Sequence, residues 1–216
     1  MRSCGSNWLP AIPERFWQID GTNCAQHALL TCADRCYYLW EYAPRRGYGF
    51  SPTNQLISNL KIKPSLLAGC ATRAQYKRIA ITHAAAALRQ IISREFVEMH
   101  ATFIPMPCSK AIGDVEYDDR MARVLGSSFE GWAADVRQML IITESRAADH
   151  ECTERVSYET LRAMTRLIDS ATPRPIIVVV DDVLNSGKHY KVARELLSAR
   201  YPHARVRGVF LARCTR

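Results

Sequence analysis

Two adjacent aspartates follow an unbroken apolar run and precede a short polar turn, an order of residues that suits a phosphorylated ligand. The run covers residues 176–180, the acids are Asp181 and Asp182, and the turn covers residues 185–189. An unbroken Ile/Val run predicts a strand covered on both faces, as in a parallel sheet. Ligands of such sheets bind at the carboxyl ends of the strands. Because carboxylates accept from hydroxyls and amides donate to phosphate, the segment fits a sugar phosphate.

The turn at residues 185–189 also opens a helical pattern, where unpaired amides and the helix dipole favour an anion. A Walker A loop does not fit, because Asp182 stands where its first glycine belongs and His189 replaces its hydroxyl residue. A Walker B strand also ends in acids, but no Walker A loop precedes this one. A core strand with a polar turn and no ligand stays open from these residues alone.

A second strand-like run, residues 102–105, leads into the sequence Pro-x-Pro-x-Ser-Lys, which ends at Ser109 and Lys110. The two prolines stiffen the exit from the strand, so both side chains would stand where a strand passes into a loop. Arg120 follows after two aspartates, and its planar guanidinium suits a pyrophosphate. An ordinary solvated pair, Lys110 and Arg120, is the alternative.

Together the two segments resemble the phosphoribosyl-pyrophosphate signature of type I phosphoribosyltransferases, and especially their competence-associated, ComF-like branch. The resemblance extends over about residues 36–213 and implies that Asp181 and Asp182 hold the ribose hydroxyls. The loop that would wrap the 5-phosphate consists of Asn185, Ser186, Gly187, Lys188 and His189. It departs from the family pattern at both ends, where Asn and His replace Thr or Ser, although both can donate to phosphate.

The resemblance also implies a reaction, the displacement of pyrophosphate from ribose C1 by an acceptor that the sequence does not identify. Mg²⁺ would bridge pyrophosphate and ribose oxygens, with Asp181 and Asp182 near the metal. Ser109, Lys110 and Arg120 would stabilise the leaving group. His150, in a predicted flap after residue 143, is a candidate acid or base, with an exposed loop histidine as the alternative. The family setting is DNA uptake or phage defence.

The chain alternates strand-like and helical segments, which predicts an α/β fold with a doubly wound, mostly parallel sheet. We expect a phosphoribosyltransferase-like core over residues 75–216, preceded by an extension and hood over residues 1–74. Strands are expected at 36–42, 102–105, 139–143, 176–180 and 206–211, and helices at 54–60, 75–96, 117–125, 157–168 and 190–199.

Composition limits the remaining possibilities. The 216 residues and an apolar fraction of 48% suit one domain with an ample core. There is no run of eighteen apolar residues and no apolar centre of a secretory signal near the start, so we expect a cytosolic protein without a membrane partner. A homodimer is left open.

The charge of the chain raises a function of a different class. The net charge is +8, and residues 187–216 hold eight Lys/Arg against one acid, Glu195. Such a basic end would bind nucleic acid or a ribonucleoprotein. The alternative is a basic surface around an anionic-substrate site. A non-catalytic protein that senses phosphoribosyl pyrophosphate is the companion hypothesis.

Eight cysteines are many for the cytosol, where disulfides are rare. Cys24, His27, Cys32 and Cys36 form a compact run of zinc-ligand residue types. A zinc ribbon uses two separated Cys-x2-Cys hairpins, which this chain lacks. Structural zinc at these four residues is therefore left open. Most of the other cysteines, which are scattered along the chain, are interpreted as small buried hydrophobic residues.

Overall fold

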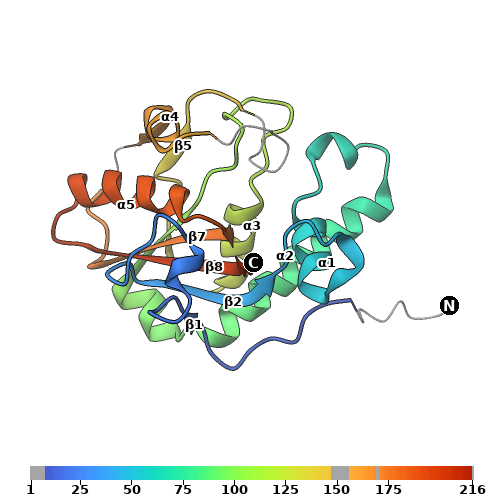
Figure 1. Ribbon diagram of the computed structural model, residues 1–216, viewed down its shortest axis with the longest axis horizontal. Coiled ribbons are helices and arrows are strands. Elements are labelled where there is room, and N and C mark those ends of the chain that lie inside the picture. Colours follow the sequence, from blue (N-terminus) through green and yellow to red (C-terminus); the bar gives the residue numbers. More distant parts are fainter. Residues whose placement is uncertain (1–7, 147–155, 169–170, 216) are drawn as a thin grey trace.

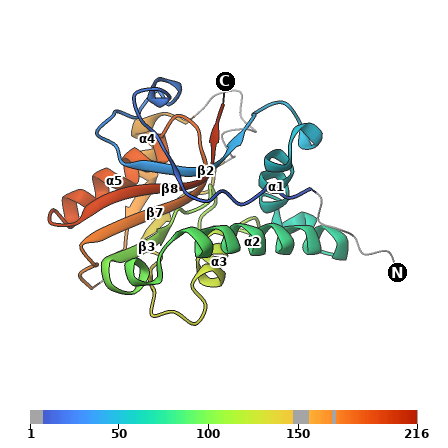
Figure 2. The ribbon, with the colours of Figure 1, turned by 90° about the horizontal axis from the view of Figure 1, so that it is seen from below.

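The computed structural model describes residues 8–146, 156–168 and 171–215, and its centre is one six-stranded sheet (Figure 1). Its strands are β1 (Trp17–Gln18), β2 (Cys36–Tyr42), β3 (Ala101–Pro105), β4 (Asp135–Val136), β7 (Ile176–Leu184) and β8 (Arg205–Cys214). They lie in the order β1-β2-β8-β7-β3-β4, and only β1 pairs antiparallel with its neighbour. Figure 2 shows β2, β8, β7 and β3 side by side. The prediction of an α/β fold with a mostly parallel sheet is confirmed.

Helices cover both faces of this sheet. α1 (Pro52–Leu60), α2 (Ala71–Ile91) and α3 (Arg120–Ser128) pack with Val178 and Val180 in one core. α5 (Lys188–Arg200) packs with Ile177 and Val179 in a second core on the opposite face. Successive strand residues point to opposite faces, so the apolar run of β7 fills both cores. The expectation that this strand is covered on both faces is confirmed.

A two-stranded antiparallel hairpin, β5 (Leu140–Ile142) with β6 (Thr165–Leu167), stands beside the main sheet. It corrects the helix predicted at 157–168, because α4 (Tyr158–Met164) ends where β6 begins. The Thr165 hydroxyl donates to the Leu161 carbonyl at 2.7 Å and its backbone pairs with Ile142. Pairing with a distant strand therefore overrides the helical spacing of these residues.

Other boundaries also move. β7 continues past residue 180, because Asp181 stays paired with Phe210 and Leu184 with Arg213 of β8, so both acids lie within the strand. α3 begins at Arg120, not at residue 117, and α2 begins four residues before its predicted start. The short helical turns are η1 (Cys24–Gln26), η2 (Tyr48–Phe50), η3 (Pro64–Leu66) and η4 (Phe96–His100). In the described part of the chain, no helix combines the length and apolarity needed to cross a membrane.

Candidate functional site

The two aspartates of β7 lie in different surroundings because the strand turns successive side chains to opposite faces. Asp182 continues the face of Val178 and Val180, toward α1 and α3, and Asp181 continues the face of Ile177 and Val179. Both are buried, with exposed fractions of 4% and 8%. The sequence places them side by side, and the structure separates their environments.

Asp182 is held by two cations. Its Oδ1 lies 2.9 Å from Lys61 Nζ, directly after α1, and its Oδ2 accepts from Arg120 Nη2 at 2.5 Å and Nε at 2.9 Å. Burial alone would raise the pKa of Asp182, but the charges of Lys61 and Arg120 outweigh it and hold this pKa well below its usual range. Asp182 is therefore ionised, and both of its oxygens are occupied.

The ion pairs continue away from β7 into the helical layer. Arg120 Nη1 donates to Asp118 Oδ2 at 3.1 Å, and the buried Lys77 of α2 donates to the same oxygen at 2.7 Å. Lys77 also donates to the Ile62 carbonyl at 2.7 Å, beside Lys61. Burial lowers the pKa of Lys77 against the opposing effect of Asp118. Three cations and two carboxylates thus join α1, α2, α3 and β7.

The contacts of Asp181 differ from those of Asp182. Its Oδ1 accepts the backbone N–H of Asp182 at 2.8 Å, and its Oδ2 lies 3.9 Å from His189 Nδ1. Arg146 Nη2 lies 3.0 Å from His189 Nε2. Because a guanidinium only donates, Nε2 accepts and the imidazole proton stands on Nδ1, on the side of Asp181. Asp181 therefore keeps acceptor capacity for a ligand hydroxyl.

The predicted phosphate loop turns directly from β7 into α5. Gly187 adopts a φ of +84°, which favours glycine, and a Cβ there would lie 2.5 Å from Leu30 Cδ2. Asn185 is exposed and Ser186 is half-buried, and the Ser186 hydroxyl accepts the Lys188 N–H at 3.4 Å. Lys188 begins α5 with a buried side chain whose ammonium donates to the Val156 carbonyl. The backbone N–H of Lys188 therefore lies in the loop, whereas its ammonium contacts Val156.

N-terminal residues contact the carbonyl side of this loop. His27, fully buried, lies with Nδ1 2.5 Å from the Asn185 carbonyl oxygen, and the Leu29 N–H donates to the Ser186 carbonyl at 3.0 Å. Figure 1 shows the blue N-terminal segment lying over β7 and the start of α5. The segment containing His27 is thus part of the loop's surroundings.

The second predicted loop, with Ser109 and Lys110, follows β3, the neighbour of β7 on the side opposite β8. Its Ser109 carbonyl accepts the Arg146 N–H at 3.0 Å, so the loop is tied to the segment after β5. Cys108 Sγ accepts the Asp118 N–H at 3.4 Å, which links the loop to the residue before Arg120. The loop with Ser109 and Lys110 therefore follows the strand next to the one that carries the two acids, and it is linked to the segment before Arg120.

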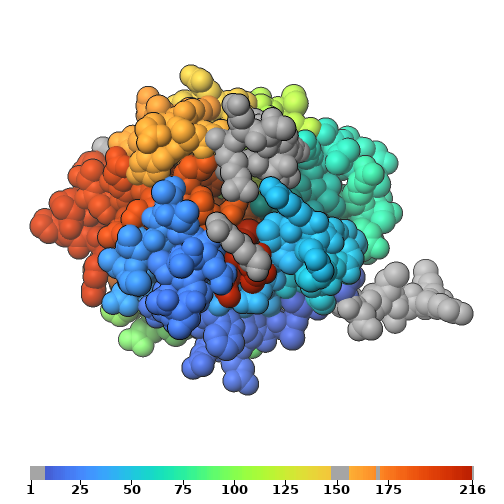
Figure 3. All heavy atoms as spheres, viewed as in Figure 1, coloured from blue at the N-terminus to red at the C-terminus, as the bar shows by residue number. Residues whose placement is uncertain are grey.

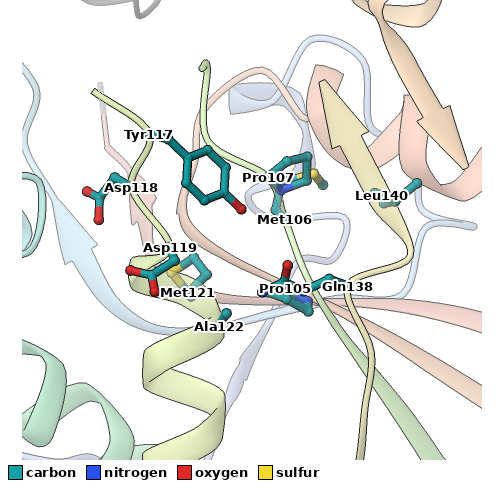
Figure 4. Close-up of a pocket in the computed structure, with 10 residues that line it drawn as sticks. All are labelled: Pro105, Met106, Pro107, Tyr117, Asp118, Asp119, Met121, Ala122, Gln138 and Leu140. Atoms are coloured by element: carbon teal, nitrogen blue, oxygen red, sulfur yellow. The ribbon is translucent and has the colours of Figure 1, made fainter. Parts of the chain in front are cut away.

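A small hollow lies between these segments (Figure 4). Tyr117 and Asp119 face Pro105 and Pro107 across it, with Leu140 of β5 on the far side, and Asp118 points away from it. A second hollow is lined by Pro107, Arg146 and His189, among others. Both hollows border the loop after β3.

The predicted zinc set does not converge on one point. The Cys32 thiol is exposed beside Cys24, whereas burial raises the pKa of Cys36 to about 12, next to the Tyr190 hydroxyl. His27 faces Asn185 through Nδ1. Across residues 8–146, 156–168 and 171–215, no three His, Cys, Asp or Glu side chains group as metal ligands. His150 lies outside the described residues.

The donor set also bears on Mg²⁺, predicted at Asp181 and Asp182. Lys61 and Arg120 occupy both oxygens of Asp182, so this carboxylate does not fit direct coordination in the present arrangement. Asp181 is the acid with an oxygen left for a metal-bound water or a ligand hydroxyl. A magnesium ion here would need most of its oxygen ligands from the ligand itself and from water.

Some cations of the basic C-terminal region pair with carboxylates within the chain. Lys191 and Arg194 both pair with the fully buried Asp34. Arg213 pairs with Glu41 at 2.5 Å and stacks over the Tyr38 ring. Lys191 and Arg194 join α5 to the N-terminal segment, and Arg213 of β8 pairs with β2, so fewer of these cations are presented to a partner.

Sequence reasoning did not include Lys61, Lys77 and Asp118 among the site residues. Lys61 ends a predicted helix and Asp118 stands two residues before Arg120, but no spacing links them to Asp182. His27 was considered only as a zinc ligand. No protein-family model matches the chain, and a search of curated proteins finds no match.

Proposed function

We propose that this protein binds 5-phosphoribosyl 1-pyrophosphate with Mg²⁺ and transfers phosphoribose to an acceptor, as a type I phosphoribosyltransferase-like enzyme of the ComF-like kind. The observation that carries the proposal is the junction of β7 with α5. There Asp181, the left-handed Gly187 and the first amides of a 13-residue helix follow one another at the carboxyl end of a central parallel strand. Carboxylates and amides in this order suit a ribose 5-phosphate.

The neighbouring strand supports the pyrophosphate half of the ligand. Ser109 and Lys110 follow β3, which pairs with β7 over five residues, so their loop starts beside the β7 acids. Arg120 and Lys61 place two cations at the carboxyl end of β7, where both pair with Asp182. In the proposed reaction these cations and the loop amides stabilise charge on the departing pyrophosphate, while the 185–189 loop fixes the position of ribose C1.

Within the proposal, Asp181 accepts from a ribose hydroxyl, and Asp182 holds Lys61 and Arg120 in place. When bound, Mg²⁺ would neutralise part of the pyrophosphate charge, with its ligands drawn mainly from phosphoribosyl pyrophosphate and water. The N-terminal residues up to 74 would form the hood over the acceptor, and the acceptor itself is not specified by the residues of the site.

Calorimetric titration of phosphoribosyl pyrophosphate with Mg²⁺ into the protein tests the proposal, with ribose 5-phosphate and ATP as comparisons. We expect phosphoribosyl pyrophosphate to bind more tightly than either, because it alone engages both loops. Equal affinity for ATP, or no binding of phosphoribosyl pyrophosphate, would overturn the assignment. Selective binding would justify a screen of acceptors that follows pyrophosphate release.

A second candidate, a sensor that binds phosphoribosyl pyrophosphate without transfer, is favoured by the occupied oxygens of Asp182. An enzyme with two acids free for ribose would have a stronger hold on the transition state than one with a single free acid. Tight binding without pyrophosphate release across nitrogen nucleophiles would select the sensor. The nucleic-acid hypothesis has less support, because Lys191, Arg194 and Arg213 of the basic region pair with Asp34 or Glu41 within the chain.

A further inference from the structure

The N-terminal strap, defined here as residues 27–30, makes three contacts with the loop between β7 and α5. His27 Nδ1 lies 2.5 Å from the Asn185 carbonyl, the Leu29 N–H lies 3.0 Å from the Ser186 carbonyl, and Leu30 covers the site where Gly187 lacks a side chain. In the space-filling view, blue atoms of the N-terminal segment lie against orange atoms near the start of α5 (Figure 3). The strap therefore contacts three successive loop residues.

The first two contacts fix the direction of two peptide groups. A carbonyl oxygen only accepts, so His27 donates through Nδ1. In a trans peptide the C=O and the following N–H point in opposite directions. Because the Asn185 and Ser186 carbonyls point at the strap, the N–H groups of Ser186 and Gly187 point away from it. Successive N–H groups on one side, next to a left-handed residue, form an anion-binding concavity.

The strap is itself anchored on the same helix. Asp34, fully buried, accepts the Thr31 N–H at 2.8 Å and pairs with Lys191 and Arg194 of α5. Burial raises the pKa of Asp34, but the hydrogen bonds from Thr31, Lys191 and Arg194 outweigh burial, and the pKa lies below its usual value. The Asp34 carboxylate is therefore ionised at neutral pH. His27 is thus held by a rigid segment, and it can hold the loop in turn.

We propose that His27 is a positioning residue for the phosphate of the ligand. Its hydrogen bond to Asn185 sets the orientation of the Ser186 N–H toward a phosphate monoester, and the Leu29 amide does the same for Gly187. The inference rests on the proposed function for the identity of the loop as a phosphate site. The inference adds that His27 and Leu29, which are far from the loop in sequence, raise the affinity of the loop for the 5-phosphate. They leave the affinity of the protein for pyrophosphate unchanged.

Substitutions at His27 separate its donor from its bulk. The side-chain nitrogen of Asn takes about the place of His Nδ1, and that of Gln takes about the place of Nε2. We expect His27→Ala and His27→Gln to weaken ribose 5-phosphate binding about tenfold, and His27→Asn to stay within about threefold of the wild type. Inorganic pyrophosphate, titrated into each variant, should bind with unchanged affinity.

His83 provides a matched control. Its Nε2 lies 2.8 Å from the Pro10 carbonyl oxygen, and its ring stacks on Trp40. His83→Ala removes the same kind of contact to the N-terminal segment and should leave ribose 5-phosphate affinity unchanged. Circular dichroism checks that each variant is folded. If His27→Ala does not fold, the comparison of His27→Asn with His27→Gln still decides.

The proposal is overturned if folded His27→Gln binds ribose 5-phosphate like the wild type, or if pyrophosphate binding falls in parallel. It is also overturned if the wild type binds no phosphate monoester. If ribose 5-phosphate binds in a His27-dependent way but phosphoribosyl pyrophosphate binds no better, the positioning role stands and the proposed function fails. The two inferences are therefore separable in one set of titrations.

Discussion

Asp181 and Asp182 are neighbours in one strand, yet one is locked in an ion network and the other is left with acceptor capacity. Asp182 contacts Lys61 and Arg120, and through Arg120 it is linked to Asp118. Asp181 contacts a backbone amide and lies 3.9 Å from His189. The alternation of a strand assigns the two carboxylates to opposite faces, so two identical residues in sequence take different tasks.

The difference teaches that an acidic pair at a strand end need not act as a pair. On the face covered by α1 and α3, the Asp182 carboxylate stabilises the packing of these helices on β7 and sets the position of Lys61 and Arg120. On the α5 face, Asp181 lies in β7 shortly before the loop of residues 185–189, which we propose binds phosphate. Stability and ligand binding should therefore respond separately to substitution of the two acids.

The largest expected effect is on stability, from Asp182→Asn. This substitution leaves Lys61 and Arg120 without their shared anion, which should lower the free energy of unfolding by about 3–5 kcal/mol. Urea denaturation at pH 7 measures it. The exposed Asp119→Asn, at the start of α3, is the control and should change stability by less than about 0.5 kcal/mol. If Asp182→Asn changed stability as little as Asp119→Asn does, the structural role assigned to Asp182, and its contrast with Asp181, would be wrong.

The next effect concerns ligand binding, from Asp181→Asn. We expect the affinity for phosphoribosyl pyrophosphate to fall at least about tenfold, which is about 1.4 kcal/mol, because a carboxylate acceptor for ribose is lost. Stability should change by less than about 1 kcal/mol, since Asn can still accept the Asp182 N–H. Calorimetry and urea denaturation on the same preparation test both statements. A folded variant with wild-type affinity would exclude Asp181 from the site.

A smaller change is expected from Lys61→Met, which removes one of the two cations at Asp182. The Lys61 side chain is about a third exposed, at 29%, and Arg120 remains bidentate to the carboxylate. We expect a loss of about 1 kcal/mol in urea denaturation, in the range of partly screened ion pairs. A loss as large as that of Asp182→Asn would mean that Lys61 alone stabilises the buried charge.

Acid should reduce the contribution of Asp182, because its folded-state pKa lies below the unfolded value. The ionised carboxylate stabilises the fold above about pH 4, and this contribution is lost as the pH falls below that value toward the folded-state pKa. The stability difference between the wild type and Asp182→Asn should narrow by about 1 kcal/mol between pH 7 and pH 3. Urea denaturation at both pH values measures it, and a constant difference would contradict the depressed pKa.

Local sequence patterns were sufficient for the fold class and for β2, whose predicted and observed ranges agree. The apolar run of β7 and the glycine of the turn likewise carried strong local signals. They failed at β6, where three residues with helical spacing pair with β5 instead. The strand exists because a distant partner is present, and no local propensity encodes that partner.

For the site, sequence predicted that Asp181 and Asp182 follow a buried parallel strand, but not what each one contacts. Asp182 and Lys61 are far apart in the chain, as are His27 and Asn185. Neither contact follows from spacing, because each depends on how α1 or the N-terminal strap packs on the completed sheet. Long-range packing decides which of the two adjacent acids is paired with cations. The sequence alone predicted the same role for both.

The parallel pairing of β2 with β8, in which Cys36 stands opposite Gly208, also constrains the protein during its synthesis on the ribosome. β2 ends at Tyr42 and the strand that covers its inner edge begins at Arg205, so about 160 residues are translated between the two. At about 5–20 residues per second, the backbone N–H and C=O groups on this side of β2 wait for roughly 10 s or more without their partner strand. Completion of the sheet is therefore a late step, and a nascent chain stalled before β8 would be a natural substrate for chaperones.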